Sequence, residues 1–131
     1  MAERKDVGRL LNKRWLLVIA YVGVIFILSA QPGFKVPGSF IYKDKVAHAL
    51  EYGGLSLLMH RDVRTSWPHV GTVRRALLTV LAIAVLAATD EWFQKGIPQR
   101  DSSPYDWMAD MIGACLSQAW GVARDKRRGR A

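Results

Sequence analysis

Four predominantly apolar stretches alternate with polar segments along the chain. They cover about residues 15–30, 44–59, 76–94 and 104–123. Each approaches the roughly 17–25 residues that cross a bilayer as an α-helix, the second only if its polar start is counted. Because backbone groups in lipid must be paired within the segment, apolar stretches of this length are expected to be helical. The pattern predicts an all-α integral membrane bundle of four transmembrane helices.

The connecting segments carry the usual signals of loops. Residues 31–43 hold two prolines and two glycines, residues 60–75 are basic, and residues 95–104 are polar. The chain has 131 residues and no internal repeat, so we expect a single membrane domain over residues 1–131.

The charges predict the orientation of the bundle. Fourteen of the 19 Lys and Arg residues lie in the N-terminal segment, the central loop and the C-terminal tail, and five lie on the other side of the predicted bundle. The positive-inside rule places the richer side in the cytoplasm, so both termini are expected there. Trp15 and Trp120 then fall at inner helix ends and Trp92 and Trp107 at outer ends, where indoles favour the interface.

Three alternatives fit the sequence less well. A signal peptide has a shorter apolar core than residues 15–30, and further apolar stretches follow them. A soluble helical bundle has narrower apolar stripes than these runs. The net charge of +8 is also typical of nucleic-acid binding, but cytoplasmic Lys and Arg explain it without nucleic acid. Cys115 is the single cysteine, which excludes an intramolecular disulfide.

Polar and ionisable side chains gather near the predicted outer face. At about 100° per residue, each group shares one face of its helix. The groups are Asp44, His48, Glu51 and Tyr52; Asp90, Glu91 and Gln94; and Asp106, Asp110, Gly113 and Ser117, with Arg100, Ser102 and Ser103 in the loop beside them. An ionisable group within a span is costly and usually faces a partner or a water-filled cavity. We therefore expect one pocket open to the outer leaflet.

Several of these residues also have structural interpretations. Asp44 is a candidate N-cap, and Ser103 followed by Pro104 and Asp106 fits a capping box. For Asp44 and Asp106, capping and function carry equal weight. Gly113 suits close helix packing better than chemistry.

Two kinds of chemistry suit this set of residues. His48 with Asp44 or Glu51 is a candidate acid–base element, and Arg100 a candidate phosphate or carboxylate ligand. Gln94, Tyr52, Ser103 and Asp106 are candidate substrate contacts, and Asp90, Glu91, Asp106 and Asp110 would position a metal or water. A divalent metal is an option, with oxygen ligands suiting Mg²⁺, Ca²⁺ or Mn²⁺ and His48 suiting Zn²⁺. No compact motif such as HExxH supports it.

The spacing of these residues resembles the VanZ-like family of membrane proteins. The family pattern is a DK-x-x-H-x-x-x-Y segment and a later DE-x-x-Q-x-x-x-P-x-R-x-x-S-x-x-D-x-x-x-(N or D)-x-x-G segment. This chain carries Asp44-Lys45, His48 and Tyr52, then Asp90-Glu91, Gln94, Pro98, Arg100, Ser103, Asp106, Asp110 and Gly113. Residues 28–33 also look like the end of the family's first span, and the resemblance covers about residues 15–123. Many relatives carry Asn where this chain has Asp110.

The resemblance implies a bacterial cytoplasmic-membrane protein connected with the cell envelope, because the family is named after a protein associated with teicoplanin resistance. Membrane lipids or a lipid-linked envelope precursor are the expected partners. Two classes of function stay open: a hydrolase or transferase, and a non-catalytic binding or structural protein that affects the envelope or glycopeptide susceptibility. A transporter is a weaker third reading, since four short helices show no broken-helix repeat.

Overall fold

The computed structural model describes residues 13–32, 35, 37–38, 42–100 and 102–129, and these form four α-helices and no strands. The helices are α2 (Lys13–Ser29), α3 (Lys43–Ser66), α4 (Thr72–Gln94) and α5 (Pro104–Arg128). The all-α, four-helix prediction is confirmed. Four of the basic residues that were counted for the orientation lie outside the described residues: Arg4, Lys5, Arg9 and Arg130.

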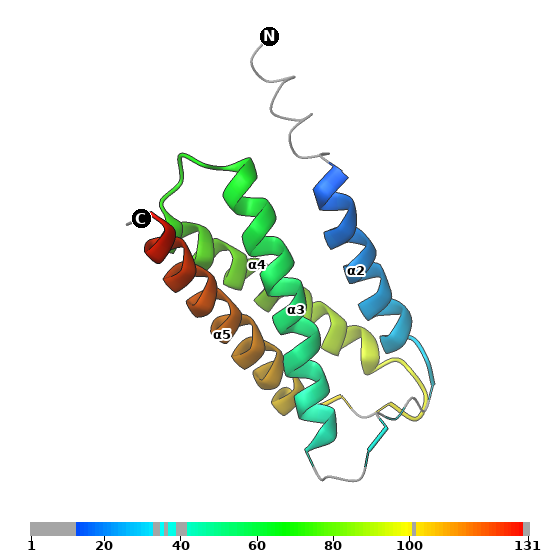
Figure 1. The fold of residues 1–131 in the computed structure, drawn as a ribbon. Coiled ribbons are helices and arrows are strands. Elements are labelled where there is room, and N and C mark those ends of the chain that lie inside the picture. Colours follow the sequence, from blue (N-terminus) through cyan, green and yellow to red (C-terminus); the bar gives the residue numbers. More distant parts are fainter. Residues whose placement is uncertain (1–12, 33–34, 36, 39–41, 101, 130–131) are drawn as a thin grey trace.

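Figure 1 shows the helices running alternately up and down. The start of α2, the α3–α4 connection and the end of α5 lie at one end of the bundle. The α2–α3 and α4–α5 connections lie at the other end, which we call the loop end. The polar ends of α3, α4 and α5 that the sequence singled out meet at this loop end.

Local chemistry explains where the helices begin and end. The Ser103 hydroxyl accepts a hydrogen bond from the backbone N–H of Tyr105, and Pro104 occupies the first turn of α5. Helix α3 ends at Ser66, shortly before Pro68, because a residue preceding proline disfavours helical backbone. Helix α4 ends before Gly96 and Pro98. The predicted serine cap is therefore confirmed.

Three helices extend beyond their predicted spans. Helix α3 continues past residue 59 to Ser66, α4 begins at Thr72 rather than residue 76, and α5 continues past residue 123 to Arg128. The predicted ends mark where the sequence stops being apolar. A helix ends only where its backbone is interrupted, and polar side chains join the extensions of α3 and α5 to each other.

Helices α3 and α5 make the most extensive interhelical contact. At its centre the backbone of Gly113 lies directly against that of Ala49, and Gly53 lies opposite Gly113 and Ser117. Nearer the termini, Gly121 lies against the ring of His60. Small residues permit this close approach, so the predicted packing role of Gly113 is confirmed.

The interior of the bundle combines an apolar core, which includes Tyr52, Leu55, Ile83 and Ala87, with buried polar side chains, and much of its exterior is apolar. Helix α5 buries Asp106, Asp110 and Gln118. Its outward stripe is apolar and more than half exposed, and consists of Tyr105, Met108, Ile112, Leu116 and Trp120. Large exposed hydrophobic side chains also cover α2 and α4. Contiguous apolar stripes on the outside are uncommon in soluble helical bundles, whose outward faces are mostly polar.

One helix in the described ranges, α4, is long and apolar enough to cross a membrane by length and composition alone. Helix α2 is apolar but has 17 residues. Helices α3 and α5 carry the buried polar residues of the cluster, which lower their hydropathy.

Candidate functional site

The centre of the polar cluster at the loop end is a contact between α3 and α5. His48 Nδ1 and Asp110 Oδ1 share a hydrogen bond of 2.9 Å, and both side chains are buried. The sequence predicted that His48 would work with Asp44 or Glu51 on its own helix. Among described residues its hydrogen bond is instead made across the helix interface, because the close α3–α5 packing brings Asp110 nearer to the ring.

A second carboxylate of α5 lies on the other side of the imidazole. Asp106 is buried and forms an ion pair with Lys45 of α3, and its Oδ1 lies 3.9 Å from His48 Nε2. Asp106 thus holds α5 against α3, rather than completing the predicted capping box. Asp44 lies in the first turn of α3, where Tyr42 is the N-cap, and is 3.8 Å from Lys45 Nζ. The prediction that Asp44 caps the helix was wrong by two positions.

Asp90 connects α4 to two neighbouring helices. Its Oδ2 accepts hydrogen bonds from the Tyr52 hydroxyl at 3.2 Å and from Gln94 Nε2 at 3.0 Å. The same Gln94 nitrogen donates to Ser29 Oγ of α2 at 3.1 Å. The predicted site residues Tyr52, Asp90 and Gln94 are therefore brought together.

Glu91, one residue further along α4, turns toward the α4–α5 loop and α5. Ser102 Oγ donates to Glu91 Oε2 at 2.6 Å and also contacts the Glu91 backbone carbonyl at 2.9 Å. The hydroxyl of Ser103 instead caps α5. Of the two loop serines, the one that contacts the cluster is therefore Ser102, to which sequence analysis gave no role.

Three buried carboxylate oxygens of this cluster have no hydrogen-bond partner in the described part of the chain. They are Asp90 Oδ1, Glu91 Oε1 and Asp110 Oδ2. A buried ionised oxygen that lacks a partner loses its hydration without compensation. The cluster is thus incomplete as a purely structural network.

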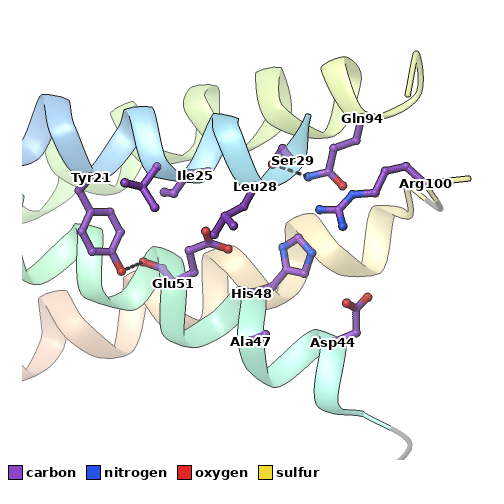
Figure 2. A pocket seen from close by; sticks show the side chains of 11 residues that line it. Tyr21, Ile25, Leu28, Ser29, Asp44, Ala47, His48, Glu51, Gln94 and Arg100 are labelled. Atoms are coloured by element: carbon purple, nitrogen blue, oxygen red, sulfur yellow. Dashed lines mark hydrogen bonds between the residues drawn. The ribbon is translucent and has the colours of Figure 1, made fainter. Parts of the chain in front are cut away.

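A cavity of about 380 Å³ lies beside the cluster, between α2 and α3. Figure 2 shows Tyr21 at one end and Gln94 and Arg100 at the other, with His48 and Glu51 directed into the space. The α2 wall is largely apolar, and the opposite wall and the Arg100 end are polar. Gln99, with φ 59°, turns the backbone immediately before Arg100.

Two sets of side chains could hold a metal ion. The first is Asp44, His48 and Asp106, and the second is His48, Glu91 and Asp110; within each set the ligand atoms lie within 4.8 Å of one another. The residue types suit a divalent cation, as the sequence suggested. Both sets include His48, which makes the imidazole the centre of either arrangement.

A second polar cluster, which sequence analysis did not predict, lies toward the chain termini. His60 Nδ1 is 2.8 Å from Gln118 Oε1, and His60 Nε2 is 3.1 Å from Asp125 Oδ2. Arg64 Nη1 donates to Asp125 Oδ1 at 2.9 Å, and Gln118 Nε2 donates to Ser56 Oγ at 2.9 Å. No buried side-chain N or O atom of these five described residues lacks a partner. This cluster has the character of a structural network.

Its sequence signal was present but weak. Ser56, His60 and Arg64 recur every fourth residue, and Gln118 and Asp125 are seven residues apart. Both spacings keep side chains on one helix face. The basic character of residues 60–75 instead favoured a loop, which hid the pattern.

No family model, curated protein or solved structure matches the chain.

Proposed function

We propose that this chain is a bacterial VanZ-like protein that crosses the cytoplasmic membrane four times, with both termini in the cytoplasm. Its site at the outer face would bind a lipid or lipid-linked envelope substrate. The distribution of side chains supports the membrane part of the proposal: large apolar side chains cover much of the outside, and buried ionisable side chains gather at the loop end. Exposed apolar surface of this extent is typical of contact with lipid.

The observation that best supports an amphiphilic substrate is that the α2–α3 cavity has one apolar wall and one polar wall. Val24, Ile25 and Leu28 offer an apolar wall to a lipid chain. His48 and Arg100 offer charged and polar groups to a headgroup. The volume, about 380 Å³, lies within the range of small-ligand pockets. An amphiphile with a phosphate-bearing headgroup matches both walls, since a guanidinium binds phosphate oxygens in bidentate fashion.

His48 and Asp110 suit proton transfer at this headgroup. A carboxylate that orients an imidazole through one nitrogen is a recurring acid–base arrangement, and the observed bond is 2.9 Å. In hydrolysis of a diphosphate lipid, water would attack a phosphorus atom and break the P–O–P bond. His48 would accept the proton of the water, and the products would be inorganic phosphate and a monophosphate lipid.

The alternative is a non-catalytic structural module. A structural network pairs its buried polar groups, as the His60 cluster does. The His48 cluster leaves three buried carboxylate oxygens without a partner among described residues. The contrast is one between the two clusters, since Arg61 Nη2, Asp62 Oδ2 and Arg75 Nε, outside the His60 cluster, also lack a partner among described residues. It supports a binding site at His48 over a purely structural role.

The test uses the full chain purified in detergent, titrated with polyprenyl diphosphate and with phosphatidylcholine as a zwitterionic control. We expect the diphosphate lipid to raise the melting temperature and to release phosphate slowly. Arg100→Ala should weaken the binding at least tenfold. Lys95→Ala is the matched control, because Lys95 is an exposed cation just after α4 at the same end of the bundle.

His48→Ala separates binding from chemistry. We expect this variant to retain the lipid-induced thermal shift and to lose phosphate release. Equal responses to both lipids, or an Arg100→Ala variant that binds like the wild type, would refute recognition of a phosphate headgroup. Full phosphate release by His48→Ala would refute the acid–base role of His48. If the wild type binds the lipid without any turnover, the protein is a binding protein and not an enzyme for this lipid.

A further inference from the structure

We propose that His48, Glu91 and Asp110 form a specific site for one divalent transition-metal ion, Mn²⁺ or Zn²⁺. The inference concerns the site of the proposed function, but it does not require a lipid substrate. With the ion bound, both ring nitrogens of His48 are engaged, so the ion would take over from His48 the activation of water. It rests on the geometry of three buried side chains from three helices. Their ligand atoms lie within 4.8 Å of one another.

The first argument is the charge of the cluster. Asp90, Glu91 and Asp110 are buried at the loop end, and none forms an ion pair with a lysine of the described residues. Asp90 and Glu91 accept hydrogen bonds from neutral groups, and Asp110 faces the imidazole. Ionised carboxylates gathered at low dielectric repel one another, so a divalent cation would offset a large part of their charge.

The second argument is that two buried carboxylate oxygens of this set have no hydrogen-bond partner. Asp110 is 1% exposed and Glu91 is 7% exposed, yet Asp110 Oδ2 and Glu91 Oε1 have no hydrogen-bond partner in the described structure. Both residues belong to the set whose ligand atoms converge on His48. Buried oxygens left over in this way mark a position where another atom is needed.

The third argument is the spacing at His48. Its Nδ1 and Asp110 Oδ1 are 2.9 Å apart. Two ligands of one metal, each at roughly 2.1 Å from the ion and at right angles, are about 3 Å apart. A metal could thus replace the proton between these two atoms. The other ring nitrogen, Nε2, faces Asp106 at 3.9 Å, and a carboxylate behind the second nitrogen is a usual companion of a metal-binding histidine.

The competing set, Asp44, His48 and Asp106, is less suited to a metal. Lys45 already neutralises Asp106 through an ion pair, and the side chain of Asp44 is half exposed. The combination of one imidazole nitrogen with carboxylate oxygens favours Mn²⁺ or Zn²⁺ over Mg²⁺ and Ca²⁺, which prefer oxygen ligands alone. Bound there, the ion would act as a Lewis acid at the polar end of the α2–α3 cavity.

The test is metal binding to the full chain in detergent after removal of metals with EDTA. Isothermal titration with Mn²⁺ and Zn²⁺ should give one ion per chain for at least one of them, and the Mn²⁺ electron paramagnetic resonance spectrum should change on binding. Glu91→Gln and Asp110→Asn keep side-chain shape and should each weaken binding at least tenfold. Asp44→Asn is the matched control and should bind as the wild type does.

Several results would overturn the inference. These are no stoichiometric binding by the wild type up to millimolar metal, unchanged affinity in both Glu91→Gln and Asp110→Asn, or loss of binding in Asp44→Asn alone. Tighter binding of Mg²⁺ than of Mn²⁺ and Zn²⁺ would exclude the His48 nitrogen as a ligand. Size-exclusion profiles and melting curves without metal show whether each variant is folded.

The two proposals fail separately. The lipid titration repeated in EDTA tests headgroup binding without metal. If lipid binding persists and metal binding is absent, the metal inference is wrong and the proposed function stands. If the metal binds with the expected variant pattern and no lipid binds, the metal inference stands and the proposed function is wrong.

Discussion

Gly113 of α5 lies against the backbone of Ala49 in α3, so closely that a Cβ atom at position 113 would come within 1.9 Å of the Ala49 carbonyl oxygen. His48 precedes Ala49, and Asp110 lies nearly one turn before Gly113. The contact that brings the two helices together therefore also sets the distance between the imidazole and its carboxylate. The same contact thus determines both the packing of α3 against α5 and the geometry of the site.

Gly113→Ala should destabilise the bundle and separate His48 from Asp110. The added methyl meets backbone, which cannot rotate away, and overpacking of this kind costs about 1–3 kcal/mol. Thermal unfolding in detergent measures the effect. Gly23→Ala in α2 is the control, because a Cβ there meets nothing within 4 Å and alanine favours the helix. Equal melting temperatures for the two variants would contradict the close approach.

Asp125→Ala should lower the melting temperature by removing the acceptor that His60 and Arg64 share. Both donors then lose a charge-assisted hydrogen bond between α3 and α5, worth about 1–3 kcal/mol for a partly buried group. Lys126→Ala, an exposed neighbour, should have little effect. Ligand binding at the loop end should survive in both, and a stability unchanged by Asp125→Ala would show that the cluster is not structural.

Arg75→Ala should loosen the connection between α3 and α4. The buried guanidinium donates to the backbone carbonyls of Trp67 and Pro68 at 3.2 and 3.4 Å, and to Thr72 Oγ1 at 3.1 Å. Loss of these partly buried hydrogen bonds should cost roughly 1–3 kcal/mol of stability. Arg74→Ala removes an equal charge from an exposed position and serves as the control. Proteolysis rates within residues 67–71 should rise in the Arg75 variant only.

Cysteine labelling tests the proposed four-span topology. In a Cys115→Ser background, Lys95→Cys at the loop end should react with a membrane-impermeant maleimide in intact spheroplasts. Arg127→Cys, near the end of α5, should react only after the membrane is permeabilised. The charge count requires this orientation. Labelling of both positions in intact spheroplasts, or of Arg127→Cys alone, would contradict it.

The local pattern of residues was sufficient to predict four helices and most of their limits. A helix pairs its backbone groups within itself, so its presence depends on nearby residues such as Pro68, Ser103 and Pro104. The extensions of α3 and α5 were missed because hydropathy records where apolar character ends. It does not record where a helix ends, and the contacts of Asp125 with His60 and Arg64 involve residues more than 60 positions away.

The residue types of the polar cluster were also evident from the sequence, since charged groups on one face of an apolar helix are conspicuous at helical spacing. Their pairing was not. Sequence analysis placed His48 with Asp44 or Glu51, which share its helix, whereas the structure pairs it with Asp110. It also gave no role to Lys45 or Ser102, which contact Asp106 and Glu91. Periodicity identifies the face of one helix, but not which residue of another helix lies opposite.

The order of residues alone thus accounts for the helices, the faces that carry polar groups and the asymmetry of charge, because these depend on short-range geometry. Tertiary packing decided the partners of each carboxylate and which oxygens remain without one. The physical reason is the glycine-mediated approach of α3 to α5 at Gly113 and Ala49, which fixes their rotation and depth. A shift of one turn would separate His48 from Asp110 and leave every sequence pattern unchanged.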